Sequence, residues 1–288
     1  MIDALIGGLA TGSLYSMLAV GFVLIFAATG VANFAQGSLA MVAAFFAFTA
    51  ATRWGWHVWL AAPFGLAAAT LTSYLVYTIG IRPLQISDHL YKGVATLAID
   101  ITIVNLARVI WGPSSYQFDS VFRGQTIEVG GLNLPVSYFV TFAVALASAL
   151  LLQALLKYTR TGIAIRSVTQ NPGAALLMGV DLPRISALSW AASGLLAGIA
   201  GILLAPVAYV SFNMMSPYLI RMFAAAALGG LTSVWGAVLG GMILGLLEGA
   251  IGRFVPATLI DVVSVLALLA VLVFRPQGLF GTIRVRRV

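Results

Sequence analysis

Apolar stretches of about 20 residues recur along almost the whole chain, and the connections between them are too short to form a soluble domain. About eight such stretches occupy residues 4–28, 34–51, 58–80, 91–111, 136–156, 185–207, 219–252 and 257–274. Hydrophobic residues make up 61% of the 288 residues and charged residues only 8%, whereas soluble proteins contain about 25% charged residues. The sequence therefore predicts an all-α polytopic membrane protein with one transmembrane domain over residues 1–288.

The longest water-compatible segment is residues 157–184, between two strongly apolar stretches. Residues 169–172 interrupt its helical pattern, and Asn171-Pro172 is typical of an N-cap followed by the first position of a helix. Gly179 suits the end of that helix after Met178. The sequence predicts two helical pieces, of which the second, Asn171 to Met178, is short and apolar. Because so short a helix is marginal in water, we expect it to dock on a partner.

The distribution of Lys and Arg predicts the topology, because membrane proteins retain these residues in their cytoplasmic loops. The segment 157–184 is basic and is predicted to be cytoplasmic, and so are the C-terminus and a loop near residues 82–92. The basic residues of the segment are Lys157, Arg160, Arg166 and Arg184. Those of the C-terminus are Arg275, Arg284, Arg286 and Arg287, and those of the third loop are Arg82 and Lys92. Residues 112–135, with Asp119, Arg123 and Glu128, have a weak charge bias and are predicted to form an outer loop.

These assignments require an even number of crossings between residue 184 and the C-terminus. Residues 219–252 are too long for one ordinary span and are interrupted at residues 229–233. They are predicted to form a re-entrant helical hairpin, since irregular backbone at membrane depth occurs only inside protein or around a cavity. The prediction is therefore seven full spans plus one re-entrant hairpin, with the N-terminus outside.

Several classes of site have no sequence signature in this chain. The chain has no P-loop, and its only lysines are Lys92 and Lys157, so nucleotide binding in the Walker manner is excluded. His57 and His89 stand apart from other metal ligands, and there is no cysteine, so no metal site is predicted. No nucleophile motif or carboxylate pair indicates an enzyme. The net charge of +7 is explained by the membrane topology and not by nucleic-acid binding.

Polar side chains within or beside the apolar stretches are candidates for lining a solute path, because they need partners at membrane depth. The candidate path residues are Asn33, Gln36, Ser38, Thr96, Asp100, Asn213, Thr232 and Ser233. For each of them, a purely structural role is the alternative. Asp100 lies in the middle of the fourth stretch, where a carboxylate is costly, with Thr96 one turn before it on the same face. A proton or cation role for Asp100 and a pairing with another helix or subunit both remain open.

Two further acids lie within the apolar stretches. For Glu248 a functional role also remains open, and a structural or interfacial role is favoured. Glu248 follows Gly241 and Gly245 at helical spacing, so it lies on a face of small residues that permits close helix packing. Asp261 falls in the first turns after Pro256 and is predicted to be a charge at the level of the lipid headgroups, favoured by the helix N-terminus.

Four motifs resemble branched-chain amino acid ABC importer permeases. They are residues 161–181 (TGIAIRSVTQNPGAALLMGVD), 33–37 (NFAQG), 228–230 (LGG) and 274–280 (FRPQGLF). The resemblance covers nearly the whole chain and is strongest to the shorter, H-type subunit. Asp100 departs from the family pattern, in which a small or apolar residue is more common at that position.

The resemblance implies a multi-pass protein of the bacterial inner membrane that works with an M-type permease, two cytoplasmic ATPases and a periplasmic solute-binding protein. Solute would then move to the cytoplasm by alternating access, with no cofactor on this chain. Segment 157–184 would be the cytoplasmic coupling loop, and its mini-helix would sit in a groove on an ATPase. The residues assigned to this coupling are Arg166, Asn171, Ala174, Ala175, Leu176, Leu177, Met178 and Gly179.

The predicted function is therefore that of a permease subunit for branched-chain or related amino acids and similar small carboxylates or amides. The alternative is an ion-coupled secondary transporter or channel that uses Asp100. The solute itself is not encoded in a recognisable motif.

Overall fold

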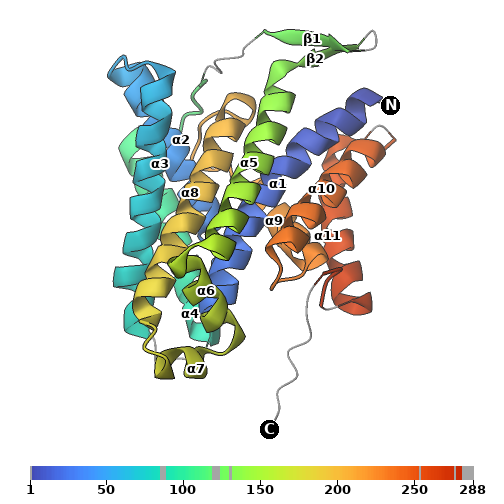
Figure 1. Cartoon of the computed structure of the whole chain (residues 1–288). Helices are drawn as coiled ribbons and strands as arrows, with labels where there is room; N and C mark the ends of the chain where they lie inside the picture. The colour runs from blue at the N-terminus through green and yellow to red at the C-terminus, as the bar shows by residue number, and fades with distance from the viewer. Residues whose placement is uncertain are drawn as a thin grey trace. The chain divides into compact units, whose positions relative to one another are not determined.

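The computed structural model describes residues 2–84, 89–118, 124–129, 132–252, 254–275 and 277–280. Helices dominate it (Figure 1). The helices are α1 (Ile2–Thr29), α2 (Gln36–Phe48), η1 (Thr49–Arg53), α3 (Val58–Leu75), η2 (Val76–Ile81), η3 (Arg82–Leu84), α4 (His89–Trp111), α5 (Val136–Tyr158), α6 (Arg160–Gln170), α7 (Pro172–Leu177), α8 (Leu182–Ala208), α9 (Ser216–Gly229), α10 (Val234–Ile251) and α11 (Ala257–Phe274). The strands β1 (Thr126–Val129) and β2 (Leu132–Pro135) form one antiparallel hairpin.

Six helices of the described part are long and apolar enough to cross a membrane. They are Asp3–Thr29, Val58–Leu84, Leu90–Trp111, Val136–Tyr158, Leu182–Ala208 and Val234–Ile251. The predicted polytopic helical protein is thus confirmed, whereas the count of eight segments stays a prediction. The second predicted stretch is split into α2 and the π-helical turn η1, and the last contains a shorter apolar helix, Leu259–Phe274.

The predicted outer loop contains the β1–β2 hairpin, which the sequence interpretation missed. Asp119 and Arg123, which supported that loop, lie outside the described residues, and so do Arg284, Arg286 and Arg287 of the C-terminus.

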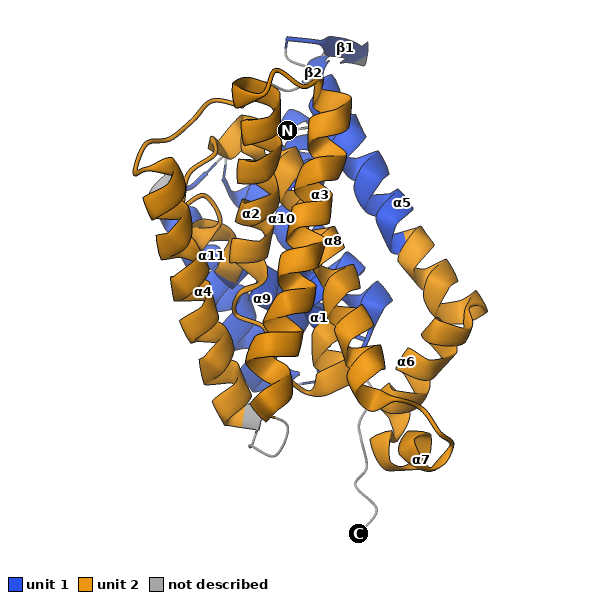
Figure 2. Ribbon diagram, turned by 90° about the vertical axis from the view of Figure 1, so that its left-hand side faces the viewer, with its two compact units in different colours: residues 1–23, 124–149, 220–288 blue, residues 24–123, 150–219 orange. Residues whose placement is uncertain are grey.

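The chain divides into two compact units (Figure 2). Unit 1 comprises residues 1–23, 124–149 and 220–288, and unit 2 comprises residues 24–123 and 150–219. The long helices α1 and α5 each contribute to both units. The prediction of one transmembrane domain is not decided by this division and stays a prediction.

In unit 2, α2, α3 and α8 pack against one another through small residues. A Cβ atom added at Gly65 of α3 would overlap the backbone of α2 at Ala43, and one at Gly201 of α8 would overlap α2 at Ala40. Ser73 of α3 donates a hydrogen bond of 2.6 Å to the carbonyl of Trp190 on α8. Small residues therefore bring these backbones together, as is common in membrane helices.

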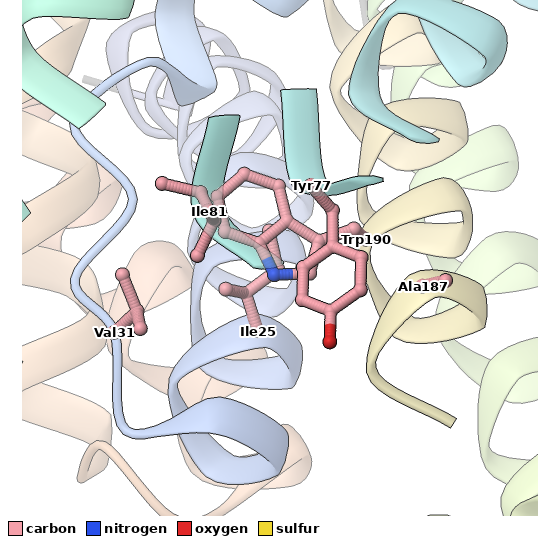
Figure 3. Packing of buried hydrophobic residues seen from close by; sticks show 6 residues of the cluster. All are labelled: Ile25, Val31, Tyr77, Ile81, Ala187 and Trp190. Carbon is pink, nitrogen blue, oxygen red and sulfur yellow. The ribbon is translucent and has the colours of Figure 1, made fainter. Parts of the chain in front are cut away.

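An apolar cluster in unit 2 joins the end of α1, the following loop, η2 and α8 (Figure 3). It consists of Ile25, Val31, Tyr77, Ile81, Ala187 and Trp190. The rings of Tyr77 and Trp190 lie 6.0 Å apart between centroids. The indole Nε1 of Trp190 is buried and has no hydrogen-bond partner among the described residues. Packing area, and not hydrogen bonding, therefore accounts for the position of this side chain.

In unit 1, the first part of α1 runs along α10 on a seam of small residues. The seam is formed by Gly8, Gly12 and Ser16 of α1 and by Gly241, Gly245 and Gly249 of α10. At each of these glycines, an added Cβ would overlap the facing helix. Ser16 also donates a hydrogen bond of 2.7 Å to the Val238 carbonyl. The sequence prediction that Gly241 and Gly245 mark a close-packing face is confirmed.

Helices α9 and α10 are joined by a short turn, which replaces the single long helix that residues 219–252 would otherwise form. Gly230 adopts a φ of 101°, a backbone conformation that favours glycine. A Cβ atom at Gly229 would overlap the Gly236 carbonyl, so the two helices touch near the turn. The predicted interruption at residues 229–233 is therefore a short turn between two helices. That these helices form a re-entrant hairpin in a membrane stays a prediction.

Candidate functional site

The segment 157–184 folds into the two helical pieces that its sequence predicts, α6 and α7. Thr159 caps α6 by accepting a hydrogen bond of 3.0 Å from the Gly162 N–H. Asn171 caps α7, with its Oδ1 atom 3.0 Å from the Ala174 nitrogen. Gly179 follows α7 with a φ of 81°, which ends the helix as expected. The local sequence therefore determines where both helices begin and where the second ends.

One side of α7 is apolar and uncovered. Leu177 and Met178 are 89% and 85% exposed, and Leu176 is also exposed. Ala175 faces the protein and is buried, and α7 contacts both α6 and α8. The mini-helix is therefore anchored through Ala175 and leaves three large apolar side chains uncovered at its C-terminal end.

The basic residues of this segment, Lys157, Arg160, Arg166 and Arg184, lie at the surface. The Arg166 guanidinium donates a hydrogen bond of 3.4 Å to the Lys157 carbonyl at the end of α5, where a positive charge also favours the helix dipole. The ammonium group of Lys157 lies 5.2 Å from the centre of the Tyr158 ring. Asp181 caps α8 by accepting a hydrogen bond of 3.1 Å from the Arg184 nitrogen.

A second group of predicted residues meets at the break between α1 and α2, in unit 2. Gln36 Oε1 accepts hydrogen bonds of 3.0 Å from the Asn33 amide and from the Ser193 hydroxyl of α8. Asn33 Oδ1 in turn accepts from the Ala35 N–H at 3.1 Å. All three side chains are fully buried. These neutral groups satisfy one another and hold the non-helical backbone of residues 30–35 against α8.

Helix α4 supports the same break from another side. Thr96 is fully buried; its hydroxyl accepts a hydrogen bond of 3.1 Å from the Phe34 N–H and lies 2.7 Å from the Gly93 carbonyl. Asp100, one turn later, is half-buried and interacts with Ser38. The Ser38 hydroxyl also donates to the Ala35 carbonyl at 2.9 Å.

The structure therefore brings five of the eight predicted path residues to one place, the α1–α2 break. They are Asn33, Gln36, Ser38, Thr96 and Asp100. Asn213 is exposed in the loop between α8 and α9. Thr232 and Ser233 belong to the α9–α10 turn of unit 1, where Ser233 caps α10 by accepting from the Gly236 N–H at 3.0 Å. A role of any of the eight in a solute path stays a prediction.

Sequence interpretation missed a charged network in unit 1, which we call the Glu248 network. Its members are Tyr15 of α1, Arg221 of α9, Glu248 of α10, and Asp261 and Ser264 of α11. Arg221 Nε donates to Glu248 Oε1 at 2.9 Å, and Arg221 Nη2 donates to Asp261 Oδ1 at 2.6 Å. Tyr15 Oη donates to Glu248 Oε2 at 2.7 Å, and the Ser264 hydroxyl donates to Glu248 Oε1.

The two acids of the Glu248 network differ in how far they are buried. The side chain of Glu248 is only 8% exposed, whereas that of Asp261 is 64% exposed and that of Arg221 is 12% exposed. The structural role predicted for Glu248 is consistent with these contacts. Asp261 is more than a headgroup-level charge, because it forms an ion pair with Arg221. An arginine inside the apolar run 219–252 is the signal that would have pointed to this network.

No group of three or more metal-ligating side chains occurs within the residues that the structure covers. What the arrangement offers is two buried polar clusters and one exposed apolar mini-helix.

Comparisons with known proteins agree with this architecture. A family model described as "Branched-chain amino acid transport system / permease component" matches residues 4–272. The chain is 27% identical to the high-affinity branched-chain amino acid transport system permease protein LivH of Salmonella typhimurium, over 100% of this chain and 97% of that protein. It is 30% identical to the probable branched-chain amino acid transport permease protein LivH of Methanocaldococcus jannaschii, over 96% of this chain and 91% of that protein.

A similar fold occurs in a solved structure entitled "PsaBC from Streptococcus pneumoniae in complex with Fab". The TM-score is 0.50 at 15% sequence identity, and the alignment covers 96% of this chain and 92% of the other. At this identity, the likeness concerns the fold alone.

Proposed function

The chain belongs to the family of permease components of branched-chain amino acid transport systems, and we propose that it carries branched-chain amino acids, or similar small carboxylates and amides, into the cytoplasm. It is a multi-pass protein of the bacterial inner membrane, with six apolar helices of spanning length in the described part. The observation that carries the proposal is the family match over residues 4–272 together with the exposed apolar face of α7.

In this proposal α7 is the coupling helix. Leu176, Leu177 and Met178 insert into an apolar groove of a cytoplasmic ATPase, which removes their exposed surface from water. Asn171 and Gly179 fix the two ends of the helix, and Arg166 ties the preceding helix α6 to the end of α5. Because Ala175 is packed against the protein, a push on α7 is passed to α6 and α8.

The partners proposed are a second, M-type permease, two ATPase subunits that hydrolyse ATP, and a periplasmic binding protein that delivers the solute. ATP binding closes the ATPases and shifts the permease pair between outward-facing and inward-facing states. In the proposed topology the N-terminus is outside, segment 157–184 is inside, and the hairpin of α9 and α10 enters from the outer side. Solute selection rests largely with the binding protein.

The test is reconstitution of the permease with its partners in proteoliposomes, with uptake of radiolabelled leucine as the readout. Uptake is expected to require ATP hydrolysis and the binding protein. Uptake that proceeds without ATP and follows an ion gradient would contradict the proposal and favour the ion-coupled alternative that uses Asp100.

A charge on α7 tests the coupling role directly. Leu177→Asp is expected to abolish most uptake while ATP hydrolysis continues, because a buried carboxylate opposes docking in an apolar groove. Leu177→Met, which keeps the side chain apolar, serves as the matched control and should transport normally. Normal uptake by the Leu177→Asp variant would rule out this docking role.

A further inference from the structure

The Glu248 network has an arrangement that allows Arg221 two positions. Its guanidinium is shared between a buried carboxylate, Glu248, and a largely exposed one, Asp261. If Arg221 withdrew from Glu248, the Glu248 carboxylate would keep two neutral donors, Tyr15 and Ser264. Arg221 would keep Asp261. Where a buried ion pair has no such substitutes, separating it leaves an uncompensated charge.

The α9–α10 hairpin is fixed at its turn and held by charge at its other end. Near the turn, the backbones of α9 and α10 touch at Gly229 and Gly236. The segment after α11 also binds there, since the Leu279 N–H donates to the Leu228 carbonyl at 2.8 Å and the Phe280 N–H donates to the Gly229 carbonyl at 3.1 Å. Away from the turn, Arg221 provides the ionic connections of α9 to α10 and α11.

We propose that Arg221 is a positioning residue for transport, which alternates between a position shared by Glu248 and Asp261 and a position on Asp261 alone. In the shared position α9 is held against α10. In the second position the part of α9 around Arg221 moves away from α10, while the turn stays fixed by its glycines and by residues 279–280. The exposed acid Asp261 is what allows this exchange. The role in transport rests on the function proposed above, whereas the two positions do not.

Distance measurements test the two positions without reference to the solute. The chain contains no cysteine, so spin labels at Ile220→Cys of α9 and Leu247→Cys of α10 attach only there when cysteine-free partners are used. Both side chains are exposed. In the reconstituted complex we expect two distance populations whose ratio changes on addition of ATP. In an added Asp261→Asn background we expect one population, because Arg221 then stays with Glu248. A single, unchanging distance in the parent protein would overturn the proposal.

Transport kinetics provide the second readout. Asp261→Asn should fold normally, because the substituted side chain is exposed, and its thermal unfolding temperature is the check. Its turnover is expected to fall about tenfold, which corresponds to one lost charged hydrogen bond in the second position. The KM for the loaded binding protein should be unchanged, and Asp261→Glu should restore turnover.

The matched control is Glu128→Gln, which removes an exposed carboxylate on β1 and should transport as the parent does. Parent-like turnover of Asp261→Asn would refute the positioning role. If the parent complex shows two distances but no ATP-driven amino acid uptake, the proposed function fails and the two positions of Arg221 stand.

Discussion

Two buried polar clusters differ in the kind of group that fills them. The cluster at the α1–α2 break in unit 2 is neutral at its centre, where Gln36 binds Asn33 and Ser193. The Glu248 network in unit 1 is ionic and joins four helices, α1, α9, α10 and α11. Both lie among apolar helices, and the residues at their centres, Gln36 and Glu248, are buried.

The two clusters also differ in what remains buried when one of their side chains is removed. In the neutral cluster, removal of one side chain leaves dipoles without partners, and in a membrane such dipoles find substitutes at modest cost. In the ionic network, removal of Arg221 leaves the full charge of Glu248 in a buried position. A neutral cluster is therefore suited to holding a fixed break in a helix, and an ionic one to a contact whose loss or exchange has large consequences.

The largest effect is expected from Arg221→Met. This change should lower the free energy of unfolding by about 3 kcal/mol, because the buried Glu248 carboxylate loses its cation and keeps only two neutral donors, Tyr15 and Ser264. Denaturant titration of the detergent-purified permease measures it. The double variant Arg221→Met with Glu248→Gln removes both charges and should recover more than half of the loss. If the double variant is no more stable than the single one, charge is not what distinguishes the two clusters.

Much of the fold follows from the sequence because membrane spans are local features. A run of apolar residues must form a helix wherever it crosses lipid, since its backbone polar groups have no other partners. The predicted last span, 257–274, has the bounds of α11, and the predicted mini-helix 171–178 contains α7 with Asn171 as its cap. An N-cap residue and a glycine that ends a helix lie within a few residues of that helix, so the ends of α7 could be predicted from the sequence.

The clusters themselves could be predicted only in part. Asn33, Gln36 and Ser38 follow one another at a visible interruption, so their shared location was accessible from the sequence. Ser193 is remote from them and joins only through tertiary packing. Arg221 is separated from Glu248 by 27 residues and from Asp261 by 40. Nothing local indicates which acid faces it, because helix contacts in a bundle are set by packing between remote segments.

A smaller effect is expected when the neutral cluster loses its centre. Gln36→Leu removes the acceptor of Asn33 and Ser193 and should lower the free energy of unfolding by about 1–2 kcal/mol. The matched control is Gln153→Leu on α5, since no hydrogen bond is described for Gln153; that change should be close to neutral. If Gln36→Leu lowers the free energy of unfolding as much as Arg221→Met does, charge does not account for the difference between the two clusters.

The smallest effect is expected at the edge of the neutral cluster. Thr96→Val keeps the shape of the side chain and removes the acceptor of the Phe34 N–H, so the same titration should give a loss of about 0.5–1 kcal/mol. Thr70→Val on α3 is the control, because the Thr70 hydroxyl bonds only to Leu66 of its own helix in the described contacts. The difference between the two threonines then isolates the contact to the α1–α2 break. Equal losses would show that Thr96 contributes nothing to holding the break, and the neutral cluster would then end at Asn33, Gln36 and Ser193.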